Sequence, residues 1–310
     1  TYDAGATPTH IYHNKGLLST TSGSTNNLYV YFAGVSSSGN APTYNLLVSP
    51  LEVQDSANTT TGHYIVGDVS ASIDTTNWFH VALTRDSSDV LRLFFGGVSM
   101  GTHTITTEDF SGTSGFLLGT YSSTDENRNL DGKIDEFRYV SKWNTYPTDG
   151  SSFTPETVAH ASEDLEDGGC SINVAVFHFD TDFSDSGPNA ITATSYEYIN
   201  STGSYPTIPD GDVSVNTDSG AGDPNEGRTA FGNSSLRILP TFNGSYIPTS
   251  EGGGGGYVSP YPSHAARGSY LTIPSNPNVT HIAANEEFTI DMWIRFDDVS
   301  GYASWNRGLP

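Results

Sequence analysis

The chain has 310 residues and is strongly acidic, with 35 Asp and Glu against 12 Lys and Arg and a formal net charge of −23. Such a surface repels the phosphates of nucleic acids, which disfavours DNA and RNA as partners. The single cysteine excludes an intramolecular disulfide and argues against a cysteine zinc site. No apolar run is long enough for a membrane-spanning helix, so we expect no membrane insertion.

Short strands joined by turns are predicted for the first part of the chain. In WFHVALTR, which begins at Trp78, every second side chain from the Phe onward is apolar, and this period of two is typical of a half-buried strand. LRLFF at 91–95 repeats the pattern, and Gly96 and Gly97 suit the tight turn of a hairpin. Further strands are predicted at 26–34, 44–53, 114–120 and 129–140, with a bulge or strand end near Glu136.

A second group of strands is predicted after residue 174, where VAVFHFD begins. FTIDMWIRF at 288–296 has the clearest alternation, with apolar Phe, Ile, Met, Ile and Phe on one face and Thr, Asp, Trp and Arg on the other. SLRIL at 235–239 and GSYLTIP at 268–274 are two more strands. No amphipathic helix longer than about two turns is expected, so the fold class is all-β.

The motifs between Trp78 and Val140 resemble the C-terminal half of a laminin-G-like domain of the concanavalin A-like type. They are a W-x-H-V-A strand at Trp78, an L-x-L-F-x-x-G hairpin at Leu91 and a G-x-I-D-E-x-R strand at Gly132. The later pieces VAVFHFDTDFSDSGPNAITA, AFGNSSLRI, GSYLTIPSN and EEFTIDMWIRFDDV are similar to the N-terminal half of the same family. The resemblance implies an antiparallel β-sandwich, the jelly roll of lectins and glucanases.

The two halves stand in inverted order, with 1–150 as the C-terminal half and 174–310 as the N-terminal half. A linker is predicted at 151–173 and a Gly-rich insertion at 240–268. Half a sandwich has open strand edges and an uncovered apolar face, so the halves must meet within one chain or between chains. The chain is then one period of a tandem array, a circular permutant, or a subunit that exchanges halves with its neighbours. We favour the array and the exchange over the permutant.

Glycosidases that share this sandwich carry two carboxylates on one strand, about 5 Å apart in enzymes that retain configuration. The strand 288–296 offers only Asp291, and simple alternation places Asp135 and Glu136 on opposite faces of their strand. The sequence also lacks a G-x-S-x-G motif. We therefore predict a protein without enzymatic activity.

A structural Ca²⁺ ion is implied by the resemblance, at the place where the start of the domain meets its last strand. That place corresponds to Asp180, Asp182 and Asp185 in FDTDFSDSG and to Asp135 in KIDEF. Carboxylate oxygens suit Ca²⁺, which takes six to eight oxygen ligands. The alternative is that the first three aspartates form turns and that Asp135 accepts a hydrogen bond at a strand end.

Glycan binding is expected on the concave face of the sandwich and its rim, where aromatic rings stack on sugars and polar groups bind hydroxyls. The candidates are Tyr29, Tyr31, Trp293 and Trp305, for each of which a core role is an equal alternative.

Three functions fit these expectations, and all three place the chain outside the cell. The first is a non-enzymatic structural and adhesive module of a virion appendage, such as a tail fibre or capsid decoration. The second is a subunit of an extracellular surface filament, polymerised by half-domain exchange. The third is a carbohydrate-binding module of a secreted hydrolase. The expected partners are other copies or tandem repeats of the chain, and glycans.

Overall fold

The structure is a computed structural model in which the described part of the chain is built from β-strands joined by turns and loops. It describes residues 11–22, 28–36, 43–50, 64–74, 76–106, 108, 110, 113–120, 130, 132–142, 144–161, 165–167, 170–172, 174–180, 182–187, 189–199, 213–217, 230–231, 234–238, 267–276, 282 and 286–296.

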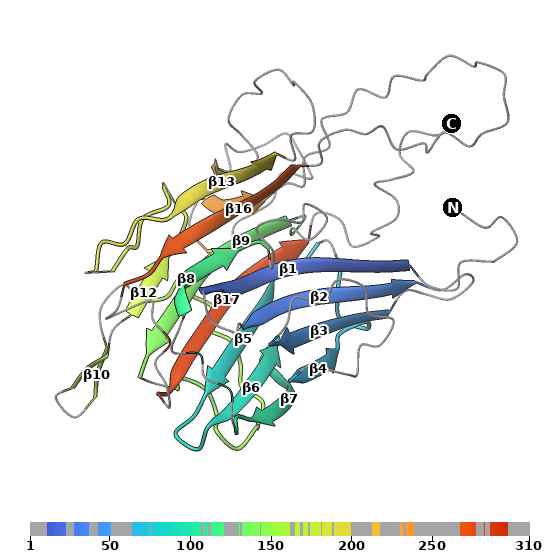
Figure 1. Cartoon of the computed structure of the whole chain (residues 1–310), viewed down its shortest axis with the longest axis vertical. Helices are drawn as coiled ribbons and strands as arrows, with labels where there is room; N and C mark the ends of the chain where they lie inside the picture. The colour runs from blue at the N-terminus through green and yellow to red at the C-terminus, as the bar shows by residue number, and fades with distance from the viewer. Residues whose placement is uncertain are drawn as a thin grey trace, which may run out of the picture.

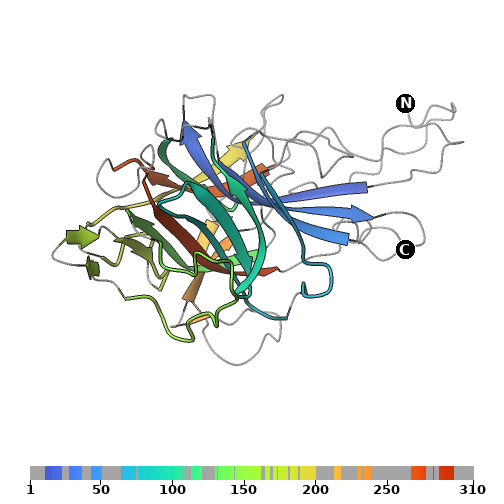
Figure 2. The ribbon, with the colours of Figure 1, turned by 90° about the horizontal axis from the view of Figure 1, so that it is seen from below.

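Two antiparallel sheets face each other as the layers of a sandwich, which confirms the all-β fold class. In the described residues the smaller sheet has seven strands, ordered β13-β16-β8-β1-β2-β3-β4. Their bounds are β13 Thr194–Ile199, β16 Arg267–Pro274, β8 Thr113–Leu118, β1 Ile11–Ser22, β2 Tyr29–Ser36, β3 Thr43–Ser49 and β4 Ile65–Asp68. Figure 2 shows this sheet, blue in β1 to β3, lying across the strands of the other layer.

The larger sheet has eight strands in the described residues, ordered β14-β15-β9-β17-β5-β6-β7, with β12 pairing beside β15 on the same edge of β9. Their bounds are β14 Val213–Thr217, β15 Ser234–Ile238, β9 Gly132–Ser141, β17 Phe288–Phe296, β5 Phe79–Arg85, β6 Val90–Phe95, β7 Val98–Thr104 and β12 Val174–Phe177. Gly96 and Gly97 connect β6 to β7 with φ values of 58° and 79°, as the hairpin prediction requires.

Strands from both ends of the chain alternate in the larger sheet, and β17 is the clearest case. It lies between β5 and β9 and pairs with both, as Figure 1 shows. In the smaller sheet the strands of the two parts meet at one place, where β16 pairs with β8. Residues 1–150 therefore do not close a sandwich by themselves, because the strand that joins β5 to β9 comes from residues 288–296.

The two parts of the chain thus meet within one sandwich in this structure. The tandem array, the exchange between copies and the permutant all stay predictions, as does the assignment of 1–150 and 174–310 to the two halves of a family domain. The predicted Gly-rich insertion at 240–268 lies almost wholly outside the described residues.

The core lies between the sheets and is filled by the apolar side chains that alternation placed inward. In β17 these are the side chains of Phe288, Ile290, Met292, Ile294 and Phe296, each at most 2% exposed. Phe32 of β2 reaches them from the opposite sheet, and its ring lies 4.8 Å from that of Phe296 in an edge-to-face contact. Burial of these faces is the main term that holds the halves together.

A bulge in β9 opposite Met292 changes the direction of two carboxylates. Glu136 has a φ of 52°, and the register between β9 and β17 shifts here. Ile134 and Phe137 consequently both point into the core although they are three residues apart. The bulge predicted near Glu136 is confirmed, and it is what sets the geometry of the outer face described below.

Close approach of β9 and β17 explains the glycine at the start of β9. A Cβ atom at Gly132 would lie 2.1 Å from the carbonyl oxygen of Arg295, a distance that real Cβ atoms do not reach. Only a residue without a side chain allows the two strands to pair at this end. The G-x-I-D-E-x-R motif therefore begins with a packing requirement.

The predicted linker 151–173 is not a uniform connection. Its last part forms a small hairpin of β10 (Leu165–Asp167) and β11 (Cys170–Ile172), which projects from the body in Figure 1. Its first part continues a segment that begins at Asn144 and lies against the outer face of the larger sheet. We call residues 144–161 the strap.

Candidate functional site

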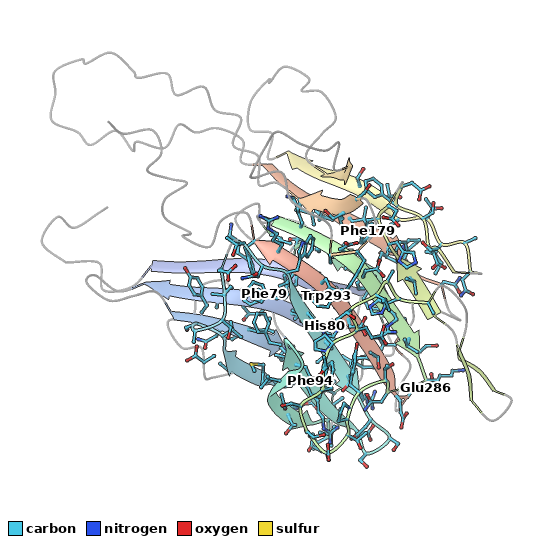
Figure 3. All side chains as sticks on the ribbon, turned by 180° about the vertical axis from the view of Figure 1, so that it is seen from behind. Phe79, His80, Phe94, Phe179, Glu286 and Trp293 are labelled. Atoms are coloured by element: carbon cyan, nitrogen blue, oxygen red, sulfur yellow. The ribbon has the colours of Figure 1, made fainter. Side chains whose placement is uncertain are left out.

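The outer face of the larger sheet carries polar and aromatic side chains where β5, β17 and β9 run side by side. His80 lies opposite Trp293, and Asp291 lies opposite both Ala82 and Arg138. Cross-strand partners point to the same side of a sheet, so these side chains form one surface away from the core. Figure 3 shows His80, Trp293 and Phe94 of β6 on this side.

The strap covers part of this face through two aromatic rings. Tyr146 and Phe153 stack with their centroids 4.2 Å apart and their planes 15° from parallel. Phe153 then meets Phe94 at 5.2 Å and His80 at 5.8 Å, both edge-to-face. Its backbone N–H donates to the carbonyl oxygen of Gly97 at 2.9 Å, which fixes the middle of the strap at the β6–β7 turn.

Asp291 is the centre of a buried ionic cluster that joins the strap to the sheet. Its Oδ2 atom accepts hydrogen bonds from Arg138 Nη2 and from the hydroxyl of Tyr146, each at 2.7 Å. Its Oδ1 atom lies 3.0 Å from Nε2 of His160. The side chain is fully buried, so the carboxylate depends on these partners for the stabilisation that water would otherwise give.

The pKa values of this cluster follow from burial and from the charges around Asp291. Burial alone raises the pKa of Asp291, but Arg138 and His160 outweigh it and hold that pKa well below its ordinary range. Burial alone lowers the pKa of His160, but Asp291 and Glu156 outweigh it and raise the value to about 9. His80 lacks such a dominant partner, and burial lowers its pKa to about 4. At neutral pH His160 is therefore charged and His80 is neutral.

Glu136 forms a second link between the sheet and the strap. Its carboxylate contacts His178 Nδ1 at 2.8 and 2.9 Å and accepts the backbone N–H of His160 at 2.8 Å. Asp135 is opposite Trp293, on the same side of the sheet. The expectation that Asp135 and Glu136 face opposite sides is therefore wrong, because the bulge breaks the alternation that it assumed.

Asp135 is buried and anchors the segment that leads into β15. One carboxylate oxygen accepts the N–H groups of Ala230 and Phe231 at 2.9 and 3.2 Å, and the other accepts the N–H of Glu136 at 2.9 Å. Burial raises the pKa of Asp135 to about 8, the nearby Glu136 adds to this, and the three donors oppose it. This agrees with the hydrogen-bonding alternative for Asp135, which ties strands from the two halves together.

The three other aspartates predicted as calcium ligands have local partners. Asp182 Oδ1 accepts the N–H of Ser184 at 2.8 Å in a turn, and Asp185 Oδ1 accepts the N–H groups of Val176 and Gly187, both at 2.9 Å. At Asp180 it is the backbone carbonyl that accepts a bond, from Ser234 Oγ at 2.7 Å. No group of three or more His, Cys, Asp or Glu side chains suited to a metal ion occurs among the described residues. The calcium site stays a prediction.

The predicted ligand-binding aromatics fall into three situations. Tyr29 and Tyr31 are 9% and 2% exposed and belong to a small cluster on the outer side of the smaller sheet. Trp293 is partly exposed at the edge of the strap, and its ring lies 5.4 Å from both His80 and Phe231. Trp305 lies outside the described residues. Trp293 alone thus presents an aromatic ring to solvent within the described candidates.

Sequence reasoning missed the residues that complete the outer-face cluster, namely Arg138, Tyr146 and His160. Arg138 belongs to a predicted motif that gives it no role, Tyr146 falls at the end of the predicted first half, and His160 falls in the predicted linker. The segment that carries Tyr146 and His160 is neither strand nor helix, so neither period gives a signal there. The signal that does exist is chemical, since Tyr146, Phe153 and His160 are unusual in a stretch otherwise rich in Pro, Thr and Ser.

Residues 5–145 match a family model described as the concanavalin A-like lectin/glucanases superfamily, of the laminin-G type. The match covers a little less than half of the chain and confirms the resemblance of its first part. Comparison with curated proteins and with solved structures gave no significant match. Among the described residues, no helix is long and apolar enough to cross a membrane.

Proposed function

Because residues 5–145 match the lectin/glucanase superfamily, we propose that the chain is a non-enzymatic adhesive module that binds glycans outside the cell. The observation that carries the proposal is the position of Trp293 on the outer face of the larger sheet. Its ring is partly exposed, and its Nε1 atom is buried with no hydrogen-bond partner among the described residues. A partly exposed aromatic ring beside polar groups is typical of a sugar-binding surface.

The carboxylates beside Trp293 support binding rather than hydrolysis. Asp291 is held by Arg138, Tyr146 and His160, and Glu136 by His178. Asp135, opposite Trp293, has both carboxylate oxygens occupied by backbone N–H groups. A glycosidase needs one carboxyl group free to donate a proton and a second free to attack or to activate water. Groups that are buried and already paired do not meet that need in this arrangement.

A glycan array with the purified chain, with and without added calcium, tests the proposal. We expect binding to a defined set of glycans, and Trp293→Ala to weaken the best of them at least 10-fold, about 1.4 kcal/mol. Trp78→Ala, a matched tryptophan substitution just before β5, should leave binding unchanged. Binding that is indifferent to Trp293→Ala, or release of reducing ends from the bound glycan, would contradict the proposal.

The finer assignment is to a virion appendage or capsid decoration. Acidic, lysine-poor composition rich in Ser, Thr and Gly supports it, because a net charge of −23 keeps densely packed copies soluble. An antibody raised against the chain and used in immunogold microscopy should label virions. Labelling of cell-surface filaments would favour the filament subunit instead, and a catalytic domain in the same polypeptide would favour the hydrolase module.

Half-domain exchange is the second candidate, and the position of β17 favours it. A strand that lies between β5 and β9 and is separated from them by more than a hundred residues can be supplied by a neighbouring copy with the same contacts. Light scattering over a wide range of protein concentration distinguishes the two states. A constant mass equal to one chain would rule out exchange, whereas growth into open-ended species would support it.

A further inference from the structure

The strap is attached to the sheet at a few points and is otherwise open to solvent. Most of its residues from 147 to 159 are exposed, among them Val158 at 65%. Its beginning is held by the N–H of Thr145, which donates to Thr289 Oγ1 at 2.9 Å, and by the Tyr146 hydroxyl on Asp291. Its end is held by His160. Its middle is held by Phe153, which packs against Phe94 and His80 and donates its N–H to Gly97. A segment held at so few points can lift as a unit when one attachment is lost.

His160 is the most fully buried of these attachment points. Its ring lies between Asp291 Oδ1 at 3.0 Å and Glu156 Oε2 at 3.1 Å, and its backbone N–H donates to Glu136. One imidazolium therefore bridges a carboxylate of the sheet and a carboxylate of the strap. Nδ1 makes a hydrogen bond with Glu156, whereas Nε2 is a close ion-pair contact of Asp291 without hydrogen-bond geometry. The neutral ring no longer carries the positive charge that both carboxylates face.

The other charged and titratable groups around His160 determine how strongly the protonated ring is stabilised. Asp291 on β17 and Glu136 on β9 are acidic, Glu156 on the strap is acidic, and Arg138 on β9 is basic. His80 on β5 and Tyr146 on the strap complete the surroundings, with His178 on the far side of Glu136. Without the His160 proton, the carboxylates of Asp291 and Glu156 repel each other across the joint between strap and sheet, and Arg138 bonds only the first of them.

We propose that the strap is a lid over the outer face of β5, β17 and β9, that protonated His160 latches it to Asp291, and that loss of this proton releases it. Release uncovers His80, Arg138 and Asp291 beside Trp293, which enlarges the face available to a glycan. The choice of a glycan as ligand rests on the proposed function, whereas the latch does not. Alkaline conditions therefore open the site and neutral or acidic conditions close it.

The direction of the pH effect follows from the raised pKa of His160. A histidine in the released strap titrates near 6.5, and the latched one near 9. The latch is therefore at full strength below pH 6.5 and is lost as the pH rises from there through 9. His80, whose pKa is lowered, titrates at more acidic pH and does not act in this window.

Hydrogen exchange of the Phe153 amide, bonded to Gly97 across the strap–sheet contact, reports the state of the lid. We expect its protection factor, which corrects for the intrinsic pH dependence of exchange, to fall at least 10-fold in the wild type between about pH 6.5 and pH 9.5. His160→Gln should show the low value already at pH 6.5. His103→Gln, a matched substitution on the edge strand β7, should behave as the wild type.

Glu156→Gln keeps the test decisive if His160→Gln does not fold, because Glu156 lies on the surface with its side chain 46% exposed. Removing this partner lowers the pKa of His160, so loss of protection should shift to lower pH. Protection that does not change with pH, or an unshifted midpoint in Glu156→Gln, would overturn the latch.

Glycan binding, measured at the same two pH values, separates the lid from the function. Tighter glycan binding at pH 9.5 than at pH 6.5 supports the proposal that the strap limits access to the site. Equal binding at both pH values, although the strap is released at the higher one, overturns that proposal. A lid that opens while no glycan binds at either pH would leave the latch standing and contradict the proposed function.

Discussion

Asp291 is the residue on which the outer-face cluster depends, since Arg138, Tyr146 and His160 all converge on its carboxylate. Asp291→Asn should cost about 3–5 kcal/mol of unfolding free energy, because it leaves two buried cations without their counter-charge. Urea denaturation at pH 7 measures this. Asp68→Asn, which affects an exposed turn with Ser70, is the control and should cost less than about 1 kcal/mol. Equal stability of the two variants would show that the cluster is not closed as described.

The lowered pKa of His80 predicts that the folded chain loses stability on acidification. Its pKa is about 4 in the folded chain and near 6.5 when unfolded, so the unfolded state binds more protons between these values. Stability contributed by neutral His80 is complete above pH 6.5 and is lost as the pH falls toward 4, by roughly 3 kcal/mol. His80→Gln should remove this part of the slope, and the difference between the two unfolding curves cancels the opposing titration of Asp135. An unchanged slope would mean that His80 is hydrated.

At the scale of the strands, the sequence could predict which side chains face the core and which face outward. The inward and outward residues of β5, β6 and β17 lie where the period of two put them, because each strand has one core face and one outer face. Which strands pair with each other could not be predicted in the same way. Nothing local in FTIDMWIRF indicates that it pairs with FHVALTR on one edge and with IDEFRYV on the other.

The strap shows a second limit of local patterns. The composition of 151–173 predicted a linker, yet Tyr146, Phe153 and His160 hold the strap on the sheet through contacts with residues far away in the chain. These three residues are seven apart, but they lie in a segment that is neither strand nor helix, so neither period applies to them. The same limit applies at Glu136, where the bulge was predicted but its effect on the direction of Asp135 was not.

Central placement of β17 predicts that the two parts of the chain unfold together. Ile290 is 1% exposed in the middle of β17, so Ile290→Ala should cost about 2–5 kcal/mol. Circular dichroism and tryptophan fluorescence should still report one transition, because β5 and β9 meet only through β17. Val98→Ala, at a side chain that is 50% exposed, is the control and should stay within about 0.5 kcal/mol. Two separate transitions would show that the halves are independent.

At the scale of the whole molecule, the net charge of −23 predicts that salt stabilises the fold. Raising NaCl from about 0.01 M to about 1 M shortens the Debye length from about 30 Å to about 3 Å and screens repulsion across the surface. We expect a gain on the order of 1 kcal/mol, a rise in Tm of roughly 2 °C or more. The buried cluster around Asp291 is screened much less. A fall in Tm would mean that surface ion pairs outweigh the repulsion.

The overall architecture was predictable because its evidence is distributed along the chain. Several weak motifs in family order identified the sandwich, and the open edges of each half required that the halves meet. The sequence could not predict whether each half pairs within its own chain or with a neighbouring copy, since a strand makes the same contacts in both cases. The structure places β17 of the chain in its own sheet.

The position of β17 also bears on how the protein is made. A ribosome delivers β5 and β9 long before residues 288–296 leave the exit tunnel, so the sheet has a gap at its centre until β17 emerges. During this delay the gap must not pair with a wrong strand, and a strongly acidic chain repels other copies of itself. Ordering of the sandwich is then expected to be slow and to wait for β17.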